Sequence, residues 1–332
     1  MLANLWCAAC SRASSEKPAG SGAEDEAITL RYQGGTGFVW FPELAEDLGY
    51  LAPLKLQFIG NTISGPQDIQ TVATGDSDFG LAFNGAVIKL VAAHAPIRAV
   101  VGGYGVDEQT FTSFFVREDS TIHSARDLIG KRVAMNTLGA HSELMLREYL
   151  RRSGLSDEET RQVTQIVLPP VNTEQALRAG QVEVAAMTSI FRDKALERGS
   201  LRQLFSDYEL YGAFTAGSYV MRRTFIKEHP KSVRKFVTGV AKAIEWARVT
   251  PREQVVARFA AIIAKRKRGE STDVIQYWKS TGIAGQGGLI HERDLQLWRD
   301  WLIKLGELKQ GQVELSDVYT NEFNPWHEAG GN

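Results

Sequence analysis

Two segments of the chain, about a hundred residues apart, share one residue pattern. The first is Gln70-Thr-Val-Ala-Thr-Gly-Asp-Ser-Asp-Phe-Gly-Leu-Ala82, and the second is Gln175-Ala-Leu-Arg-Ala-Gly-Gln-Val-Glu-Val-Ala-Ala-Met187. Each reads as the end of an amphipathic helix, a closing glycine, an acidic residue in a turn and a short apolar strand. The repetition predicts two α/β lobes of similar construction, with a small molecule bound in the cleft between them. Two unrelated strand–helix units in one ordinary α/β enzyme are the alternative.

Charge and apolar content exclude several classes of function. Lys and Arg total 38 and Asp and Glu total 39, so the chain has no basic excess for binding nucleic acid. The basic run Lys265-Arg-Lys-Arg268 is interpreted as a solvated helix end rather than a binding patch. No stretch of the sequence is apolar over the length that a membrane span needs. The 332 residues are expected to form a globular protein of two domains or one large domain.

Both cysteines, Cys7 and Cys10, lie within the first ten residues. A thiol nucleophile, a thiolate metal site or a disulfide is therefore not expected in the folded body. The opening apolar residues end in small side chains and precede the polar stretch Ser11–Gly22, which resembles the tether behind the lipid-modified cysteine of a bacterial lipoprotein. A basic start is missing and the apolar stretch is short. Cys10 is the candidate acylation site in a leader of residues 1–27, and an unmodified disordered leader is the alternative.

The order of elements predicts where each lobe begins and ends. Strand, loop, helix and strand follow in series from residue 28, which predicts a largely parallel sheet with right-handed crossovers. The pattern restarts at Phe114, and the chain is expected to cross back near Thr215–Tyr219. Lobe one is expected to comprise residues 28–113 and 217–325, with lobe two, residues 114–216, inserted. Residues 326–332 are expected to be a tail.

Three framework segments resemble those of one protein family. They are Phe115-Val-Arg-Glu-Asp-Ser-Thr-Ile-His-Ser-Ala-Arg-Asp-Leu-Ile-Gly-Lys-Arg-Val-Ala134, Ser218-Tyr-Val-Met-Arg-Arg-Thr-Phe-Ile-Lys-Glu-His-Pro-Lys-Ser-Val-Arg234 and Asp317-Val-Tyr-Thr-Asn-Glu-Phe323. In sequence and order they resemble the periplasmic substrate-binding proteins for sulfonates, taurine and nitrate, a group that includes binders of the thiamine pyrimidine precursor. The resemblance covers roughly residues 28–325. It implies the two-lobe α/β periplasmic-binding-protein fold, type II, with the ligand cleft between the lobes.

The resemblance also implies a function. The chain would be the receptor of an ABC importer, capturing a small organic anion and delivering it to a membrane permease. The anion would be an aliphatic sulfonate, a taurine-like solute or an aromatic carboxylate or sulfonate. The protein would be a periplasmic or extracytoplasmic monomer without catalysis, cofactor or metal, binding no nucleic acid and touching the membrane only through a lipid anchor.

Two alternatives to that function remain. One is a binding protein for the thiamine pyrimidine precursor. The other is an enzyme of pyrimidine precursor synthesis. It is considered because a relative with this fold makes that precursor with iron, a histidine and a cysteine-rich segment, and it is the less favoured alternative. The chain has no cysteine cluster, and no Ser/His/Asp order, catalytic carboxylate pair or phosphate-binding glycine motif stands out.

Candidate ligand-binding residues follow the carboxyl ends of the expected strands. Ligands of α/β sheets bind there, where free N–H groups and the dipoles of helix N-termini favour an anion. Five loops occupy such positions. Their candidates, with the neighbouring aromatic residue, are Gln33, Gly35, Thr36, Phe38, Asn84, Gly85, Asn136, Leu138, Gly139, Ala140, His141, Thr188, Phe191, Arg192, Gly217 and Ser218. For most of them a capping or turn role is the alternative to ligand contact.

Arg192 is the sharpest single candidate. Its guanidinium could pair bidentately with a sulfonate or carboxylate while Phe191 stacks on the ligand. Asp193 and Glu197 are close enough in sequence to hold Arg192 in a surface ion pair instead.

The loop that contains Gly139, Ala140 and His141 is expected to present consecutive N–H groups to the ligand. His141 either binds the ligand or caps its helix. Phe38 either walls the cleft or packs in the core with Trp40.

Overall fold

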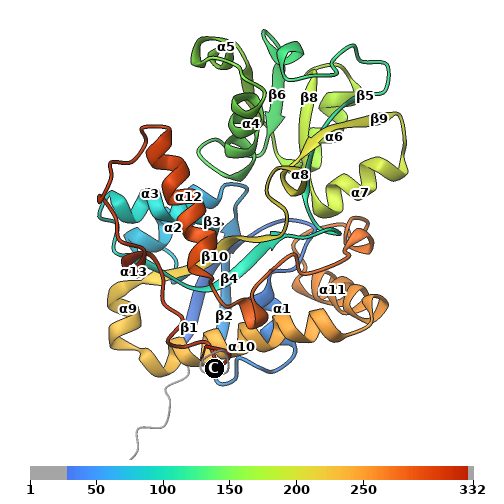
Figure 1. Ribbon diagram of the computed structural model, residues 1–332. Coiled ribbons are helices and arrows are strands. Elements are labelled where there is room, and N and C mark those ends of the chain that lie inside the picture. The colour runs from blue at the N-terminus through green and yellow to red at the C-terminus, as the bar shows by residue number, and fades with distance from the viewer. Residues whose placement is uncertain (1–27, 328–332) are drawn as a thin grey trace, which may run out of the picture.

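The computed structural model describes residues 28–327, which form two α/β lobes stacked one above the other (Figure 1). The candidate acylation site Cys10 lies outside the described residues. Lobe one, drawn below, holds strands β1 (Thr29–Gly34), β2 (Lys55–Asn61), β3 (Phe79–Phe83), β4 (Ile97–Val106) and β10 (Phe214–Arg222). Its helices are α1 (Phe41–Asp47), α2 (Gly65–Thr74), α3 (Asn84–Ala92), α9 (Arg223–Glu228), α10 (Pro230–Val249), α11 (Arg252–Arg266), α12 (Glu292–Lys304) and α13 (Leu315–Val318).

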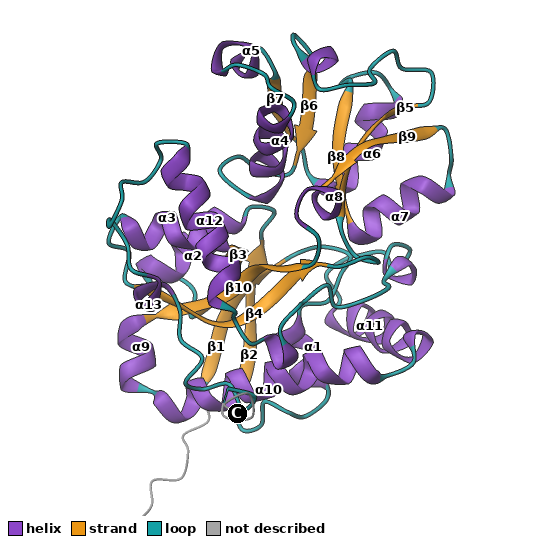
Figure 2. Ribbon diagram, viewed as in Figure 1, coloured by secondary structure: helices purple, strands orange, loops and turns teal. Residues whose placement is uncertain are grey.

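Lobe two, drawn above, carries one five-stranded sheet with helices around it (Figure 2). Its strands are β5 (Thr112–Arg117), β6 (Arg132–Met135), β7 (Thr164–Val167), β8 (Val184–Thr188) and β9 (Leu201–Ser206). Its helices are α4 (His141–Arg152), α5 (Asp157–Arg161), α6 (Pro170–Arg178), α7 (Ser189–Glu197) and α8 (Asp207–Tyr211). The strand order is β7-β6-β8-β5-β9. The two repeated strands, β3 and β8, therefore lie in different sheets, as the repeat predicts.

The expectation of largely parallel sheets is wrong in both lobes. In lobe one, β1 and β2 pair in parallel, but β10 lies between β3 and β4 and runs antiparallel to both. In lobe two, β6 is parallel to β7 and β8, whereas β5 is antiparallel to β8 and β9. Strands β5 and β10 are those that carry the chain into and out of lobe two. An antiparallel strand needs no crossover helix, so the alternation of strands and helices in the sequence does not reveal the direction of these two strands.

The bounds of β5 and β10 refine the expected lobe boundaries. Thr112 and Ser113 already pair within the sheet of lobe two, and Phe214 and Thr215 already pair with β4 in lobe one. We propose that the chain crosses between the lobes at residues 107–111 and again at residues 212–213.

Local sequence explains how the repeated helices begin and end. Ser64 caps α2 by accepting a hydrogen bond from the Gln67 N–H, and Pro66 lies in the first turn. Gly75 closes α2 with φ 93°, and Gly180 follows α6 with φ 68°. Both values lie in the left-handed region that glycine adopts at little cost, which agrees with the helix–glycine–strand pattern of the sequence.

The described residues form three apolar cores, and one of them runs through both lobes on the side of α12. It includes Phe83 and Trp298 of lobe one, together with Leu144 and Phe205 of lobe two. Phe83 and Trp298 pack with ring centroids 4.8 Å apart. The core is therefore continuous from one lobe to the other.

Polar contacts reinforce this junction between α4 and the C-terminal part of lobe one. The Trp301 Nε1–H donates to Glu148 Oε2 at 3.0 Å, and Arg147 lies 2.5 Å from Glu307. The lobes are thus joined firmly along one side. No helix in residues 28–327 is both long and apolar enough to cross a membrane.

Candidate ligand-binding cavity between the lobes

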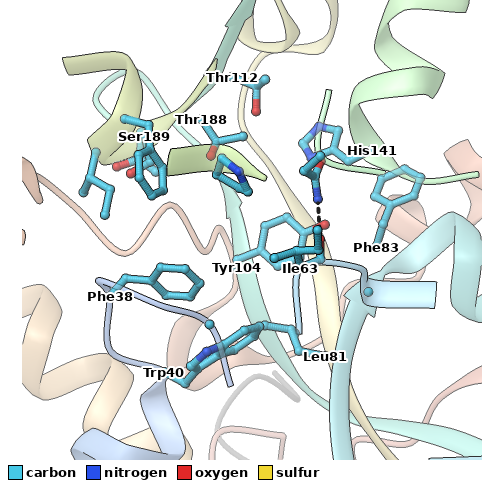
Figure 3. Close-up of a pocket in the computed structure, with 18 of the residues that line it drawn as sticks. Phe38, Trp40, Ile63, Leu81, Phe83, Tyr104, Thr112, His141, Thr188 and Ser189 are labelled. Atoms are coloured by element: carbon cyan, nitrogen blue, oxygen red, sulfur yellow. Dashed lines mark hydrogen bonds between the residues drawn. The ribbon is translucent and has the colours of Figure 1, made fainter. Parts of the chain in front are cut away.

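A cavity of about 470 Å³ lies between the lobes and is lined from both sides. Figure 3 shows Phe38 and Trp40 of lobe one facing Thr188, Ser189 and His141 of lobe two across it. The lining residues fall in segments 35–41, 62–65, 81–83, 103–105, 110–112, 136–142, 169–173, 186–191 and 275–281, with Tyr219 and Phe259. The repeated units contribute to this lining from opposite sides, through β3 and β8.

Aromatic rings form the wall on the side of lobe one. The rings of Phe38 and Trp40 lie 5.5 Å apart, and Trp40 meets Tyr219 edge-on at 6.1 Å. Tyr104 lies between them and His141 in Figure 3. A Cβ added at Gly217 would fall 2.0 Å from Tyr104 Cε1, so the glycine is what lets this ring take its place.

Helix N-termini surround the cavity. The cap residues of α2, α4 and α7, which are Ser64, Ala140 and Thr188, all line it. The positive ends of three helix dipoles therefore reach the same space, which favours a negative group. Helix α6 also begins at the cavity, but Pro169 and Pro170 at its start have no N–H to donate.

Within the described chain, none of the residues that line this cavity is Asp, Glu, Lys or Arg. The polar groups that line the cavity are neutral, and most of them are side-chain hydroxyls. They come from Thr36, Thr62, Ser64, Thr110, Thr112, Thr137, Ser142, Thr173, Thr188, Ser189, Ser280 and Thr281. Trp40 Nε1 is buried, and it has no hydrogen-bond partner among residues 28–327. This N–H is therefore an unsatisfied donor in a residue of the cavity wall.

His141 is oriented by its neighbours at the N-terminus of α4. Its ring stacks on Phe83 with centroids 5.1 Å apart and planes 8° from parallel. Its Nε2 lies 3.1 Å from Asp207 Oδ2 but is out of line for a hydrogen bond. Asp207 is held in turn, because its Oδ1 accepts the Thr112 N–H at 3.0 Å. The His141 ring is therefore held in one orientation beside the cavity.

The structure brings half of the candidate residues to this cavity. Those lining it are Gly35, Thr36, Phe38, Asn136, Ala140, His141, Thr188 and Phe191. Those that do not line it are Gln33, Asn84, Gly85, Leu138, Gly139, Arg192, Gly217 and Ser218. Gln33 lies within β1, where it pairs with Gly60 of β2.

Asn84 and Ser218 have structural partners. Asn84 is completely buried, and its Nδ2 donates to the Thr215 carbonyl at 3.0 Å. Its Oδ1 accepts the Ser218 hydroxyl at 2.8 Å. The pair therefore ties the start of α3 to β10. Gly85 packs against Phe83, because a Cβ there would lie 2.5 Å from the phenylalanine ring.

The loop before α4 was expected to present consecutive N–H groups to the ligand, but two of its polar groups bond within the protein instead. The Gly139 N–H donates to Glu143 Oε2 at 2.6 Å, so its own helix satisfies it, and Leu138 is 47% exposed. The Asn136 side chain donates to the Ile63 carbonyl at 2.9 Å, a bond between the lobes that Figure 3 marks. The first turn of α4, at Ala140 and His141, remains at the cavity.

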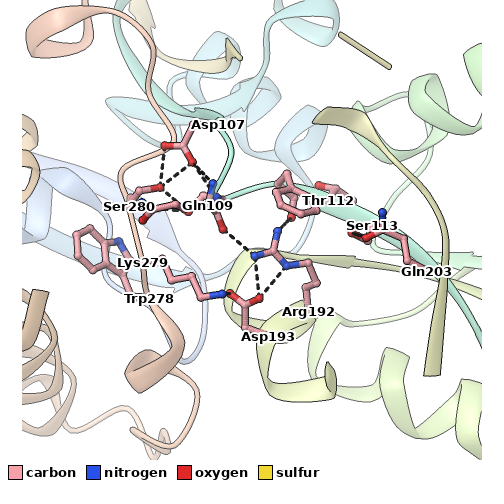
Figure 4. A network of polar contacts seen from close by, with 12 residues as sticks. Asp107, Gln109, Thr112, Ser113, Arg192, Asp193, Gln203, Trp278, Lys279 and Ser280 are labelled. Carbon is pink, nitrogen blue, oxygen red and sulfur yellow. Dashed lines mark hydrogen bonds and ion pairs between the residues drawn. The ribbon is translucent and has the colours of Figure 1, made fainter. Parts of the chain in front are cut away.

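Arg192 does not line the cavity, and Figure 4 shows its guanidinium beside Asp193 and Gln109. Residues 189–192 form the first turn of α7 rather than a loop. The buried guanidinium donates to Asp193 Oδ1 at 2.8 Å and to the carbonyls of Gln109 at 2.7 Å and Phe111 at 3.2 Å. It also lies 3.7 Å over the Phe111 ring. Arg192 therefore holds the first crossing segment against α7. Its pair with Asp193 matches the ion-pair alternative in partner, but the pair is buried rather than at the surface.

The contacts around Arg192 extend to the C-terminal part of lobe one. Asp193 Oδ2 lies 3.2 Å from Lys279 Nζ, and the neighbouring Ser280 hydroxyl donates to Asp107 Oδ2 at 2.8 Å. This network joins α7 of lobe two, the crossing segment and residues 279–280 at one edge of the cavity (Figure 4).

Sequence reasoning missed several lining residues, among them Trp40 as a donor and Tyr104. Tyr104 had a readable signal, because it stands between Gly103 and Gly105 within a strand. Glycines in a strand mark close approach of another group, and here Cβ atoms would collide with Leu81 and with the Gly282 carbonyl. Thr110 lies in the first crossing segment and Thr112 begins β5, and neither hydroxyl had a comparable signal.

In the part of the chain that the structure describes, no group of three or more His, Cys, Asp or Glu side chains is placed to hold a metal ion. The neutral donors around the cavity suit an organic ligand better than a cation.

Comparison with known proteins identifies the family. The family model described as "NMT1/THI5 like" matches residues 44–254, which is more than half of the chain. The chain belongs to the NMT1/THI5-like family. No curated protein sequence matches this NMT1/THI5-like chain.

Solved structures show the fold of this NMT1/THI5-like protein. The periplasmic aliphatic sulphonate binding protein SsuA from Escherichia coli is 21% identical with a TM-score of 0.67, over 89% of this chain and 93% of that chain. The alkanesulfonate-binding protein SsuA from Xanthomonas axonopodis pv. citri, bound to MOPS, gives the same identity and TM-score over 89% and 99%. The periplasmic nitrate-binding protein NrtA from Synechocystis PCC 6803 is 15% identical with a TM-score of 0.69, over 92% and 88%. The chain therefore has the two-lobe periplasmic-binding-protein fold.

Proposed function

We propose that this NMT1/THI5-like protein is the solute receptor of an ABC importer and binds a small organic anion between its lobes. The observation that carries the proposal is the cavity of about 470 Å³ walled by both lobes. A molecule in that space contacts both lobes at once, so its binding favours the state in which they are together. The volume lies within the range of small-molecule sites, about 300–1,000 Å³.

The walls favour one chemical class within the small organic anions. Phe38, Trp40 and Tyr104 offer flat apolar surfaces to a ring or hydrocarbon body. The first turns of α4 and α7 offer backbone N–H groups and positive dipole ends to a carboxylate or sulfonate. No acidic side chain from the described residues lines the cavity, so the ammonium group of a taurine-like solute has no carboxylate partner there. An aromatic carboxylate or sulfonate is the ligand we favour.

The structural neighbours support a transport role. Two of the three described above are named for sulfonate binding and one for nitrate binding, and all three are named as binding proteins. We propose that this chain likewise works outside the cytoplasm, as a monomer without catalysis, and docks on a membrane permease. Lipid attachment at Cys10 belongs to the same proposal.

One observation favours a second candidate ligand. The absence of Lys and Arg from the lining, together with the free Trp40 N–H, also suits a neutral heteroaromatic ring such as the thiamine pyrimidine precursor. Such a ring would stack on the aromatic wall and hydrogen-bond to the surrounding hydroxyls.

A thermal-shift comparison of matched compounds tests the proposal. A ligand that binds only the native state at 100 times its Kd stabilises it by about 2.7 kcal/mol, which raises the unfolding midpoint. We expect naphthalene-2-sulfonate and naphthalene-2-carboxylate to raise the midpoint, and taurine to leave it unchanged. A rise with aminopyrimidines alone would select the second candidate. No rise with any of these compounds, or chemical conversion of a bound compound seen by NMR, would contradict the receptor assignment.

A further inference from the structure

The basic run Lys265–Arg268 lies at the C-terminal end of α11, as expected, but only its two lysines are exposed to solvent. Lys267, at the C-terminus of α11, adopts φ 50°, and the arginines on both sides of it turn inward. The side chain of Arg266 is 8% exposed and that of Arg268 is 12% exposed. The expectation for this run is therefore wrong for its two arginines, because both side chains are largely buried and pair with Glu43, which is distant in sequence.

These arginines belong to a buried group of five side chains, which we call the α11 network: Tyr32, Glu43, Arg266, Arg268 and Glu270. Arg266 donates to Glu43 Oε2 at 2.9 Å and to Glu270 Oε1 at 2.8 Å. Arg268 donates to Glu43 Oε1 at 3.0 Å and to the Tyr32 hydroxyl at 2.7 Å, and that hydroxyl donates to Glu43 at 2.6 Å. Two positive and two negative charges balance, as a buried ionic group requires.

The α11 network also fixes the backbone of the cavity loop, residues 35–40, between β1 and α1. Glu270 Oε2 accepts the Gly37 N–H at 2.6 Å, and Glu43 Oε2 accepts the Trp40 N–H at 3.0 Å. Arg266 Nη2 donates to the Phe38 carbonyl at 3.0 Å. Three backbone groups in four consecutive residues are thus fixed by charged side chains. Two of the residues whose backbones are fixed in this way, Phe38 and Trp40, carry rings of the aromatic wall.

We infer that Arg266 and Glu270 are positioning residues for ligand binding, because they hold the cavity loop so that Phe38 and Trp40 face the ligand. Neither residue lines the cavity, so both act through the loop rather than on the ligand. Hydrogen bonds to charged groups are about twice as strong as neutral ones, and burial strengthens them further. A wall fixed before the ligand arrives loses less conformational entropy on binding. The ligand-affinity part of this inference rests on the proposed function.

The first test needs no ligand. The variant Arg266→Met/Glu270→Gln removes one charge of each sign, so the network stays balanced around Glu43 and Arg268. We expect the Gly37 and Trp40 amides to exchange with deuterium at least about tenfold faster, because their opening becomes easier. Arg258→Met is the matched control. Arg258 also links α11 to α1, through Asp47 at 2.7 Å, but its side chain is 38% exposed. Unchanged exchange, or equal acceleration in the control, would overturn the inference.

The second test measures binding of naphthalene-2-sulfonate by calorimetry in a double-mutant cycle. We expect the double variant to bind about tenfold more weakly, and this loss to disappear in a Phe38→Ala background. An equal loss in both backgrounds would show that the α11 network does not act through the loop. Arg266→Lys keeps the charge without the forked geometry, so it should lose affinity in the same direction but less. If the double variant does not fold, Arg266→Lys takes its place in the binding measurement.

The two tests separate this inference from the proposed function. If the wild-type protein binds no naphthalene-2-sulfonate, the ligand class proposed above fails. The exchange rates of the Gly37 and Trp40 amides still decide whether the α11 network fixes the loop.

Discussion

Asp78 and Glu183 make the same bonds in the two lobes. Asp78 accepts the backbone N–H and the guanidinium of Arg31, and Glu183 accepts the same two groups of Arg132. Each arginine also donates to the carbonyl of the glycine that lies three residues before its carboxylate partner. Arg31 donates to Gly75 at 2.8 Å, and Arg132 donates to Gly180 at 3.3 Å. The repeat is therefore a structural unit of helix, glycine, carboxylate and strand, held to a neighbouring strand by an arginine.

The two carboxylates should differ in their contribution to stability. Asp78 is 10% exposed and also contacts Arg222, whereas Glu183 is 32% exposed. We expect Asp78→Asn to lower the free energy of unfolding by about 1.5–3 kcal/mol, because it weakens buried bonds to charged groups. Glu183→Gln should cost less than about 1 kcal/mol, as solvent-exposed ion pairs do. Urea unfolding measures both values, and equal losses would contradict this ranking.

Replacing Arg192 should lower the free energy of unfolding, and it should not change the relative affinities for charged and neutral ligands. Arg192→Ala removes the partner of buried Asp193, and the loss of a buried pair costs about 3–5 kcal/mol. Lys279 still contacts Asp193, so we expect the lower end of this range in urea unfolding. Any affinity loss should be the same for naphthalene-2-sulfonate and its neutral sulfonamide. A loss confined to the sulfonate would show that Arg192 reaches the anionic head.

Gly217→Ala should displace the aromatic wall. The added Cβ would lie 2.0 Å from Tyr104 Cε1 and 2.6 Å from the Ala82 carbonyl oxygen. Overpacking of this kind costs about 1–3 kcal/mol and forces the ring to move. Ligand affinity should fall, and calorimetry of Gly217→Ala in a Tyr104→Ala background should show a smaller fall. If the two effects simply add, Tyr104 is not the group that Gly217 accommodates.

Acid should destabilise the junction between the lobes through Glu148. Burial alone raises the pKa of Glu148, but hydrogen bonds from Arg151, Arg152 and Trp301 outweigh it and lower the pKa from 4.5 to about 2. A carboxyl whose pKa is lower in the folded state stabilises the protein fully above its unfolded pKa. That stabilisation should disappear as the pH falls from about 5 towards 2.

Urea unfolding at several pH values measures this loss. Glu148→Gln should flatten the slope of stability against pH in that window. The matched control is Glu158→Gln, at a side chain that is 73% exposed and pairs only with Arg161 on its own helix. It should leave the slope as in the wild type, and a flattened slope in the control alone would contradict the assignment.

Features set by neighbouring residues could be predicted from the sequence. The cap at Ser64, the left-handed glycines at 75 and 180, and the repeated strands depend on residues within one helical turn of each other. The same locality explains why cavity positions at strand ends, such as Thr36 and Thr188, were found. Strand ends and helix starts leave a signal in a short window of sequence.

Features set by distant partners could not be predicted. Arg192 donates to the carbonyl of Gln109, 83 positions away, and Gly37 donates to Glu270, 233 positions away. A window around Arg192 shows only a charged side chain, which is equally compatible with solvent, an ion pair or a ligand, and a window around Gly37 gives no sign of the distant carboxylate that its N–H meets. The direction of each side chain is decided by which partner the fold brings near, and that depends on the whole topology.

The apolar core that continues from lobe one into lobe two has a consequence for how the protein melts. Phe83 and Trp298 pack in the same core as Leu144, so neither lobe can lose its packing without exposing apolar surface of the other. We expect one calorimetric transition, with equal calorimetric and van't Hoff enthalpies, instead of two separate lobe transitions. A solute bound in the cavity then shifts the whole transition, and a single midpoint reports its affinity.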